Sequence, residues 1–586
     1  MLANSVRQLC LRSASSHSAV NILMKCPRMG VILQQRIHAA LGFESRSFSA
    51  SACVWRQVMS SQYIFKSPIE EIDIPTNVTL HGYFFKVCDE YKDSPAMTDV
   101  PTGKTYTYTQ LKENIIKVAS GLHRAGFRKG DVILVFSTNQ IDFTVLQLAS
   151  SCLGLWFSPA NPQYTPMELN RQMNHSGAIS IFALDSLAGV VDQALDCKDL
   201  PHNIKSKYVF GDVPGYTPFS SLLEDDGSVY PEVSIDPLND VFTLPYSSGT
   251  TGLPKGVMLT NHNCFANVLQ SGAGLPITPN DRALGLLPLY HIYGMVVVQF
   301  GVLSGGGHLF YVPKFEAHSC LKCIQDNKIN LAHLVPPLVV FLAKNPVVSE
   351  YDVSSLQRIY SGAAPLGQDV SFACLKRHPD LQSLNQVYGL TETSPLVTID
   401  SKELPGSIGQ LTVNTLGKVA DVNSFEALPP GQVGELCVKG PQVMKGYFNN
   451  QKATDEMIDS DGWLHTGDIV YAEESGAFYA KDRIKELIKY KGSQVAPAEL
   501  EDLLQGHSDV QDAAVIGVAD EMAGELPKAF IVKKSGSNVT EEEIKKFVEE
   551  RVAHTKKLRG GVQFVDNIPK NPSGKILRRV LKTTYL

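Results

Sequence analysis

The sequence lacks three features that mark specialised classes of protein. Its 11 cysteines are scattered over 586 residues without regular spacing, whereas a secreted disulfide scaffold shows dense pairs, so we expect a reducing compartment. Polar residues interrupt every apolar stretch before it reaches 18 residues, the length that a membrane-spanning helix needs. The formal net charge of −6 supplies no broad cationic surface, which argues against nucleic acid as a partner.

The composition that remains is that of an ordinary globular protein. Hydrophobic residues make up 44% of the chain and charged residues 19%, and the length leaves room for several domains. Cys320 and Cys323 form the one close pair of cysteines, but no second pair follows to complete the four ligands of a structural zinc site. We therefore interpret this pair as part of the packing of a helix.

The first 48 residues differ from the rest in composition. They contain six basic residues, one acid and many serines, which is typical of a transit peptide that must respond to an inward-negative potential. The string from Ser45 to Ala52 resembles a matrix-protease site. We therefore predict a mitochondrial transit peptide over residues 1–48, cleaved near Phe48, and location in the matrix. The alternative is a cytoplasmic protein whose translation starts at Met59, and the last three residues are not a peroxisomal Ser-Lys-Leu signal.

From about residue 60, short apolar runs alternate with amphipathic stretches, which predicts an α/β fold. The β-branched and apolar runs Val132–Phe136 and Phe242–Tyr246 are typical of buried strands. Residues 107–126 place apolar side chains on one face at helical spacing. We predict one large N-terminal domain over residues 60–484.

A second compact unit is predicted from residue 485 to residue 586. Its expected elements are, in order, a helix at Pro497–Gln505, strands at Ala513–Val518 and Ala529–Lys533, and a helix that starts at Thr540. Thr540 and Glu543 match a capping box, in which each side chain accepts a hydrogen bond from the backbone of the other residue. This unit is a small α+β domain.

The segment YSSGTTGLPKG, from Tyr246 to Gly256, is the most informative stretch of the chain. Glycines let backbone N–H groups approach a polyanion, hydroxyls donate hydrogen bonds and lysine supplies a positive charge, so the segment is typical of a triphosphate-binding loop. It is not a P-loop, because Pro254 precedes Lys255 and Gly256 follows it. A flexible linker is the alternative, but a linker rarely lies between a buried strand and a helix that Thr260 or Asn261 could cap. The predicted phosphate-binding residues are Ser247, Ser248, Gly249, Thr250, Thr251, Gly252 and Lys255.

Four further motifs follow in the order YGLTE (residues 388–392), LHTGD (464–468), KDRIKELIKYKG (481–492) and PKNPSGKILRR (569–579). With the glycine-rich loop, they resemble the adenylate-forming superfamily, which includes luciferases and peptide-synthetase adenylation domains, and most of all the acyl-CoA synthetases similar to 4-coumarate:CoA ligase. The resemblance extends from about residue 65 to the C-terminus. It implies a large domain of layered α/β sheets with a small β-barrel subdomain, followed by a small mobile α+β domain.

The resemblance also implies the reaction. A carboxylic acid, ATP and coenzyme A are the expected partners, and Mg²⁺ is the expected cofactor. The acid would form an acyl-AMP with release of pyrophosphate, and a thiol would then displace AMP. An aryl-propenoate or a medium- or long-chain fatty acid is the expected substrate. The alternative is a luciferase-type monooxygenase, which uses the same adenylation step.

Most of the residues that would bind the nucleotide lie in the second and third motifs. By resemblance, Tyr388 with Gly389 would contact adenine and Thr391 would contact the α-phosphate. Glu392 would bind Mg²⁺, for which a carboxylate is a suitable hard ligand. Asp468 would accept hydrogen bonds from the ribose hydroxyls.

The last two motifs supply the remaining nucleotide and catalytic residues. Lys575 would stabilise the charge that accumulates when the carboxylate attacks the α-phosphate. Arg483 would be a second ribose or phosphate contact, and Lys485 would be the hinge about which the C-terminal domain rotates. Lys489 and Gln494 would assist near the adenylate.

The acyl pocket is expected in the apolar stretch from Leu286 to Phe310 and in the SGAAPLG string after residue 360. The pocket would be apolar, and a difference of one methylene group changes its discrimination by only about 1–3 kcal/mol, so the residues do not indicate a chain length. His291 would act as a gate and is counted with Lys575, Lys489 and Thr391 among the catalytic candidates. The pocket candidates are His291, Tyr293, Gly362, Ala363, Ala364 and Leu396.

Two other functions would use the same fold. A carrier-loading protein remains an alternative to a CoA ligase. A binding protein that had lost catalysis would show substitutions at key positions, but the lysines, glutamate and aspartate of the motifs are all present, at Lys255, Glu392, Asp468 and Lys575.

Overall fold

A computed structural model describes residues 63–197, 202–247, 254–401, 404, 406–483, 486–490, 493–520, 523–552, 554–570, 574 and 576–586. The side chains of residues 482, 483, 489, 493, 494 and 579 are outside this description. The chain divides into Met1–Gln62 and Tyr63–Leu586. The predicted transit peptide therefore lies outside the described residues.

The first large sheet has nine strands, in the order β10-β11-β9-β5-β4-β6-β7-β8, with β21 paired to β11. Strands β4 to β8 run parallel, whereas β10, β11 and β21 pair antiparallel. The strands are β4 (Val132–Phe136), β5 (Trp156–Ala160), β6 (Ser180–Leu184), β7 (Ser206–Phe210), β8 (Thr217–Pro218), β9 (Val241–Thr243), β10 (Tyr246–Ser247), β11 (Lys255–Thr260) and β21 (Gly446–Tyr447).

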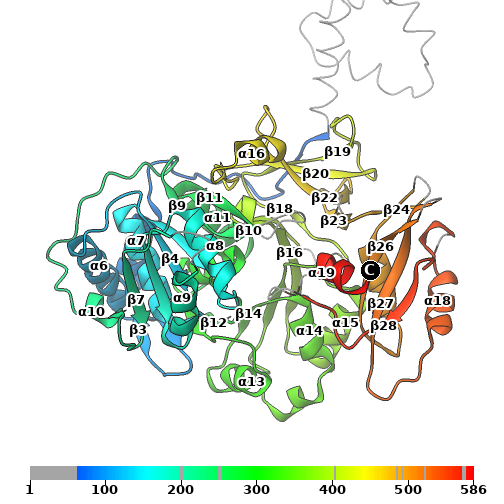
Figure 1. Ribbon diagram of the computed structural model, residues 1–586, viewed down its shortest axis with the longest axis horizontal. Helices are drawn as coiled ribbons and strands as arrows, with labels where there is room; N and C mark the ends of the chain where they lie inside the picture. Colours follow the sequence, from blue (N-terminus) through cyan, green and yellow to red (C-terminus); the bar gives the residue numbers. More distant parts are fainter. Residues whose placement is uncertain are drawn as a thin grey trace, which may run out of the picture. The chain divides into compact units, whose positions relative to one another are not determined.

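Strand β4 is buried on both faces, which explains why its sequence is apolar throughout. Successive side chains of a strand point to opposite faces of the sheet. Ile133 and Val135 belong to the core that also contains α6 and α7, whereas Leu134 and Phe136 pack with α8 and α9 on the other face. Both faces are therefore covered by helices, as Figure 1 shows for this part of the chain, and the predicted buried strand is confirmed. The helices are α6 (Tyr108–Arg124), α7 (Ile141–Leu153), α8 (Pro166–Ser176) and α9 (Ala188–Leu195).

The predicted strand Phe242–Tyr246 is wrong in detail. The structure has two short strands there, β9 and β10, separated by Leu244 and Pro245. Proline has no backbone N–H for a ladder, so it interrupts the strand. The predicted helix over residues 107–126 is confirmed as α6, with Thr107 and Gln110 forming a capping box at its start.

The second large sheet also has nine strands, in the order β18-β17-β16-β15-β14-β12-β13-β2-β3. Its central strands are parallel, and β17, β18 and β3 join antiparallel at the two edges. The strands are β2 (Pro95–Asp99), β3 (Thr105–Thr107), β12 (Arg282–Gly285), β13 (His308–Tyr311), β14 (Leu331–Leu334), β15 (Arg358–Ser361), β16 (Ser383–Gly389), β17 (Leu396–Ile399) and β18 (Gln410–Leu411).

Further helices pack on these two sheets (Figure 1). Cys320 and Cys323 are buried in α13, as expected for packing residues. Among the residues that the structure describes, no helix is both long and apolar enough to span a membrane. The helices are α5 (Leu80–Tyr91), α10 (Ser220–Leu223), α11 (Asn261–Gly274), η3 (Tyr293–Phe300), α12 (Gly301–Ser304), α13 (Ala317–Asp326), α14 (Pro336–Lys344) and α15 (Gln368–Arg377).

A third sheet has five antiparallel strands, and it is the candidate for the small β-barrel subdomain that the resemblance implies. Its order is β1-β19-β20-β22-β23, and one face encloses an apolar cluster that includes Leu436, Val470 and Phe478. Its elements are β1 (Phe65–Lys66), β19 (Leu416–Ala420), β20 (Val433–Lys439), α16 (Gln451–Met457), β22 (Leu464–Ala472) and β23 (Phe478–Arg483).

The last hundred residues form their own five-stranded sheet and core. The predicted helix at Pro497–Gln505 is confirmed as α17, and the capping box of Thr540 and Glu543 is present at α18. The elements are β24 (Ile488–Tyr490), β25 (Ser493–Val495), α17 (Pro497–Gln505), β26 (Val510–Asp520), β27 (Gly524–Lys533), α18 (Glu541–Glu549), β28 (Gly561–Phe564) and α19 (Arg578–Tyr585). The expected α/β fold with a small α+β unit at the end is thus observed.

Candidate active site

The glycine-rich segment connects two antiparallel strands. Ser247, at the end of β10, lies opposite Lys255, at the start of β11. The element that follows Lys255 is therefore a strand, and the helix expected there begins six residues later, at Asn261. Thr260 caps that helix, because its hydroxyl accepts a hydrogen bond from the backbone of Asn263 at 3.1 Å. The predicted phosphate-binding residues between the two strands lie outside the described residues: Ser248, Gly249, Thr250, Thr251 and Gly252.

Lys255 and Glu392 both contact Tyr447. The ammonium group of Lys255 lies 4.8 Å from the centre of the Tyr447 ring, and the phenol donates a hydrogen bond to Oε1 of Glu392 at 2.8 Å. Burial, and then the charge of Glu392, raise the pKa of Tyr447 well above its usual range, so the phenol stays protonated. The structure thus brings the predicted phosphate lysine and the predicted metal ligand together through a tyrosine that sequence reasoning missed.

Tyr447 is positioned by strand pairing rather than by a local motif. Strand β21 is only two residues long, and its Tyr447 pairs with Val257 of β11. The partner strand lies almost two hundred residues earlier in the chain, so no spacing rule in the sequence signals this contact.

Tyr388 and Asp468 are in direct contact. The phenol of Tyr388 donates a hydrogen bond to Oδ2 of Asp468 at 2.6 Å. Tyr388 lies near the end of β16, and Asp468 lies in β22, where it pairs with the backbone of Arg483 in β23. Tyr388, the adenine candidate, and Asp468, the ribose candidate, therefore lie side by side. The backbone of Arg483, the further candidate for ribose or phosphate binding, lies next to Asp468.

Gly389 and Thr391 shape the end of β16. A Cβ atom on Gly389 would lie 1.9 Å from the carbonyl oxygen of Pro395, so the close approach of two backbones requires glycine. Thr391 and Glu392 follow in a short 3₁₀ turn, η5 (Thr391–Thr393). Thr391 is half-buried, and Glu392 is buried.

The predicted acyl-pocket residues include one pair that the structure brings together. A Cβ atom on Gly362 would lie 3.0 Å from the ring of Tyr293, so the absence of a side chain leaves room beside this ring. His291 stands two residues earlier, and its Nδ1 accepts a hydrogen bond from the N–H of Tyr293 at 3.3 Å. Ala363 adopts a left-handed backbone with φ of +73°, and Leu396 is buried in β17. Ala364 is half-buried in the loop after β15.

The histidines of this region are neutral. Burial lowers the pKa of His291 to about 4 and that of His333, in β14, to about 3. Nδ1 of His333 lies 3.1 Å from the hydroxyl of Tyr293, which gives the buried tyrosine a polar partner. Sequence reasoning missed His333, because a histidine within an apolar strand carries no signal of what it contacts.

The C-terminal candidates are described only in part. Lys489 and Gln494 face each other as backbone partners in β24 and β25, but their side chains, like that of Arg483, are not described. Lys485 and Lys575 lie outside the described residues. Gly574, just before Lys575, approaches the start of α14: a Cβ atom on it would lie 3.2 Å from the ring of Pro337.

Comparisons with known proteins identify the family of the chain. The family model "AMP-binding enzyme" matches residues 84–448, and "AMP-binding enzyme C-terminal domain" matches residues 499–575. The chain is 41% identical to 4-coumarate–CoA ligase 3 of Arabidopsis thaliana over 532 residues, covering 89% of this chain and 93% of the relative. It is 39% identical to 4-coumarate–CoA ligase CCL1 of Humulus lupulus over 534 residues, covering 89% and 96%.

Solved structures share the fold. ATP-bound MatB from Rhodopseudomonas palustris is 26% identical with a TM-score of 0.78, covering 87% of this chain and 99% of that one. The anthranilate CoA ligase AuaEII in complex with anthranoyl-AMP is 22% identical with a TM-score of 0.80, covering 87% and 98%, and supports the fold. The fold and the converging motifs define an adenylate-forming enzyme. The chain belongs to the AMP-binding enzyme family.

Proposed function

We propose that this protein is an ATP-dependent carboxylate:CoA ligase. In the first step a carboxylate oxygen attacks the α-phosphorus of ATP, and the bond to pyrophosphate breaks. In the second step the sulfur of coenzyme A attacks the acyl carbon, and AMP leaves. The observation that carries the proposal is the convergence of polar residues from separate motifs at the end of β16, where Tyr388 contacts Asp468 and Glu392 contacts Tyr447.

Each group suits one part of the nucleotide. Asp468 offers a carboxylate to the ribose hydroxyls, and the ring of Tyr388 offers a flat face to adenine. Lys255 supplies positive charge to the phosphates, and Glu392 supplies the hard oxygen donor that Mg²⁺ prefers. Bound Mg²⁺ would neutralise phosphate charge. Lys575 would stabilise the charge that develops between the attacking carboxylate and the α-phosphate.

The acyl substrate is proposed to be an aryl-propenoate or a fatty acid. Tyr293 is buried and His291 is neutral, so the described pocket residues offer no countercharge to a second charged group on the substrate. The relatives named 4-coumarate–CoA ligases support the aromatic acid as the first candidate.

Domain organisation and location are part of the same proposal. Residues 60–484 would form the adenylation domain and residues 485–586 a mobile C-terminal domain, which the two family matches and the separate last sheet support. Residues 1–48 would be a mitochondrial transit peptide, on the composition of that segment.

The test is a panel of carboxylic acids with ATP, Mg²⁺ and coenzyme A. We expect AMP and pyrophosphate to form with aryl-propenoates or fatty acids, and AMP release to depend on coenzyme A. Formation of ADP, or no reaction with any acid, would contradict the proposal. Light emission with luciferin, ATP and oxygen would favour the monooxygenase instead.

A further inference from the structure

The TGD part of the LHTGD motif forms a bulge on β22. Cys437 of β20 pairs with His465, and Glu435 pairs with Ile469, so Leu436 alone lies opposite three residues, Thr466 to Asp468. Gly467 in this bulge has a left-handed φ of +71°. Residues in a bulge lose regular ladder bonds and depend on other partners. The position of the Asp468 carboxylate therefore depends on what holds the bulge.

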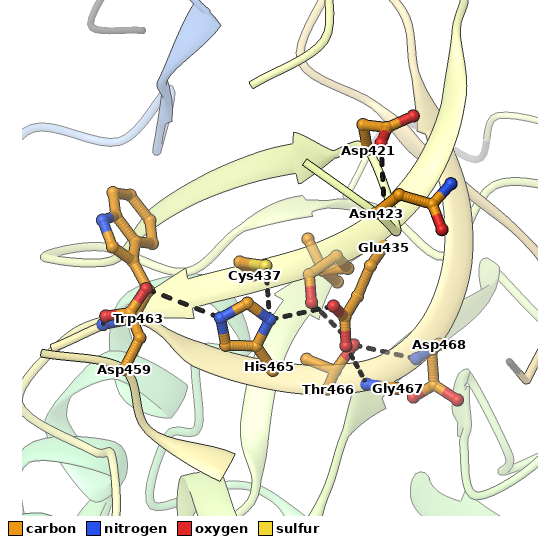
Figure 2. Close-up of polar contacts among 11 residues, drawn as sticks. Asp421, Asn423, Glu435, Cys437, Asp459, Trp463, His465, Thr466, Gly467 and Asp468 are labelled. Carbon is orange, nitrogen blue, oxygen red and sulfur yellow. Dashed lines mark hydrogen bonds and ion pairs between the residues drawn. The ribbon is translucent and has the colours of Figure 1, made fainter. Parts of the chain in front are cut away.

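Glu435 is one of the groups that hold it. Oε1 of Glu435 accepts a hydrogen bond from the N–H of Gly467 at 2.9 Å (Figure 2). The hydroxyl of Thr466 donates to the carbonyl of Leu436 at 2.8 Å and accepts from the N–H of Asp468 at 3.1 Å. Glu435 is buried, so this carboxylate is not a surface charge that solvent could replace.

His465 supports the other oxygen of Glu435. Its Nδ1 lies 2.9 Å from Oε2 of Glu435, and its Nε2 lies 3.5 Å from Oδ2 of Asp459 (Figure 2). Hydrogen bonds with Cys437 and Glu435 raise the pKa of His465 to about 10. The imidazolium thus joins two carboxylates, and both oxygens of Glu435 are in use.

The same three side chains, Glu435, Cys437 and His465, could be mistaken for a metal site, because their ligand atoms lie within 4.8 Å of one another. The shortest separation decides against this. Two ligands of a tetrahedral zinc ion, each at about 2.0–2.1 Å from the metal, lie roughly 3.3 Å apart. The 2.9 Å between Nδ1 of His465 and Oε2 of Glu435 is a hydrogen-bond distance.

We propose that Glu435 and His465 are positioning residues for nucleotide binding, which act by holding the TGD bulge so that the Asp468 carboxylate faces the ribose. The proposal rests on the function proposed above, in which Asp468 binds the ribose hydroxyls. The ribose takes no part in bond breaking, so its contacts stabilise ground and transition states alike. Loss of the support should weaken ATP binding and leave the chemical step almost unchanged.

The test compares Glu435→Gln and His465→Gln with the exposed control Glu474→Gln. We expect both variants to raise the KM for ATP about tenfold, as for loss of a hydrogen bond to a charged group, with kcat within about twofold. The KM values for acid and coenzyme A should stay as in the wild type. The control should match the wild type in all constants.

Combining Glu435→Gln with Asp468→Ala in a double variant separates a positioning role of Glu435 from general damage to the fold. If Glu435 acts through Asp468, then Glu435→Gln should add little to the loss that Asp468→Ala causes by itself. Independent, additive losses would overturn the proposal. Because His465→Gln keeps the carboxylate of Glu435, it also provides a milder variant if Glu435→Gln does not fold.

Direct measurement of ATP binding by calorimetry keeps this inference distinct from the proposed function. If the wild type bound ATP but ligated no acid, the ligase proposal would fail, and a weaker ATP affinity of folded Glu435→Gln would still support positioning. Unchanged ATP affinity in both folded variants would overturn it. If the wild type bound one zinc ion per chain and Cys437→Ser lost it, the interpretation of Glu435, Cys437 and His465 as a hydrogen-bonded cluster would be overturned.

Discussion

The phenol of Tyr388 donates a hydrogen bond to Oδ2 of Asp468 over 2.6 Å, although 80 positions separate the two residues in the sequence. This contact links strands of two different sheets, β16 and β22. It places the flat ring proposed for adenine next to the carboxylate proposed for ribose. Under the proposed function, the two motifs would form parts of one nucleotide site.

Tyr388→Phe tests this link, because it keeps the ring and removes the hydroxyl. A hydrogen bond to a charged group is worth about 1.5–3 kcal/mol when a partner is deleted, so we expect the KM for ATP to rise by about 10- to 100-fold. Tyr388→Ala should lose more, because the ring is lost as well. Steady-state kinetics with varied ATP would measure both, with Tyr471→Phe, on the same strand as Asp468, as control. Equal KM values in Tyr388→Phe and the wild type would contradict the assigned role.

Tyr447→Phe tests the contact between the phenol and Glu392. The buried carboxylate would lose its donor, which costs about 1–3 kcal/mol. We expect a lower midpoint of thermal unfolding and a higher Mg²⁺ concentration for half-maximal pyrophosphate release. A variant that melts earlier but needs no more Mg²⁺ would show that Tyr447 serves stability alone.

Gly389→Ala tests the close approach at the end of β16. The new Cβ would lie 1.9 Å from the carbonyl oxygen of Pro395, and backbone atoms cannot move aside as a flexible side chain does. We expect loss of adenylation and lower stability. Gly272→Ala in α11 is the matched control, since no atom lies within 4 Å of its Cβ position, and it should fold and function normally. A fully active Gly389→Ala enzyme would contradict this geometry.

Lys575→Ala tests the separation of the two half-reactions. We expect it to abolish pyrophosphate release, because nothing then stabilises the charge between carboxylate and α-phosphate. Thioester formation from pre-made acyl-AMP should remain largely intact. The exposed Lys582→Ala, on α19, should leave both steps unchanged. If both half-reactions survived in Lys575→Ala, its assignment would be wrong.

Three histidines with lowered pKa values predict how stability depends on pH. Burial lowers the pKa of His291 and His308 to about 4 and that of His333 to about 3, below the ordinary value of 6.5. As pH falls from 6.5 towards 4, the unfolded chain binds protons that the folded chain does not, so stability must fall. Denaturant unfolding at pH 7 and pH 5 would measure this, and equal free energies of unfolding would contradict it.

The pKa shift of His465 has the opposite sign, so its effect on the pH dependence of stability is also opposite. Its pKa is raised to about 10, so its contribution to stability is fully present below 6.5 and is lost as pH rises through about 10. The loss of stability between pH 7 and pH 10 should therefore be smaller in His465→Gln than in the wild type. This comparison uses the same unfolding experiment.

Features that depend on near neighbours were predictable from the sequence. The strand Val132–Phe136 and the helix Pro497–Gln505 have the predicted bounds, and Thr540 and Glu543 form the predicted capping box. The five motifs likewise indicated the family, because each motif is a short continuous string. Helix caps, strand propensity and motif spacing all involve residues a few positions apart, so the local order of residues contains the interacting partners.

The contacts that build the site were decided by tertiary structure. Tyr447 reaches Glu392 only because β21 pairs with β11, and Glu435 reaches Gly467 only because β20 pairs with β22 opposite a bulge. The sequence by itself determined which residues could bind a nucleotide. Which side chains hold those residues in place followed from the pairing of distant strands, because burial and hydrogen bonding depend on distance in space and carry no mark in the local order of residues.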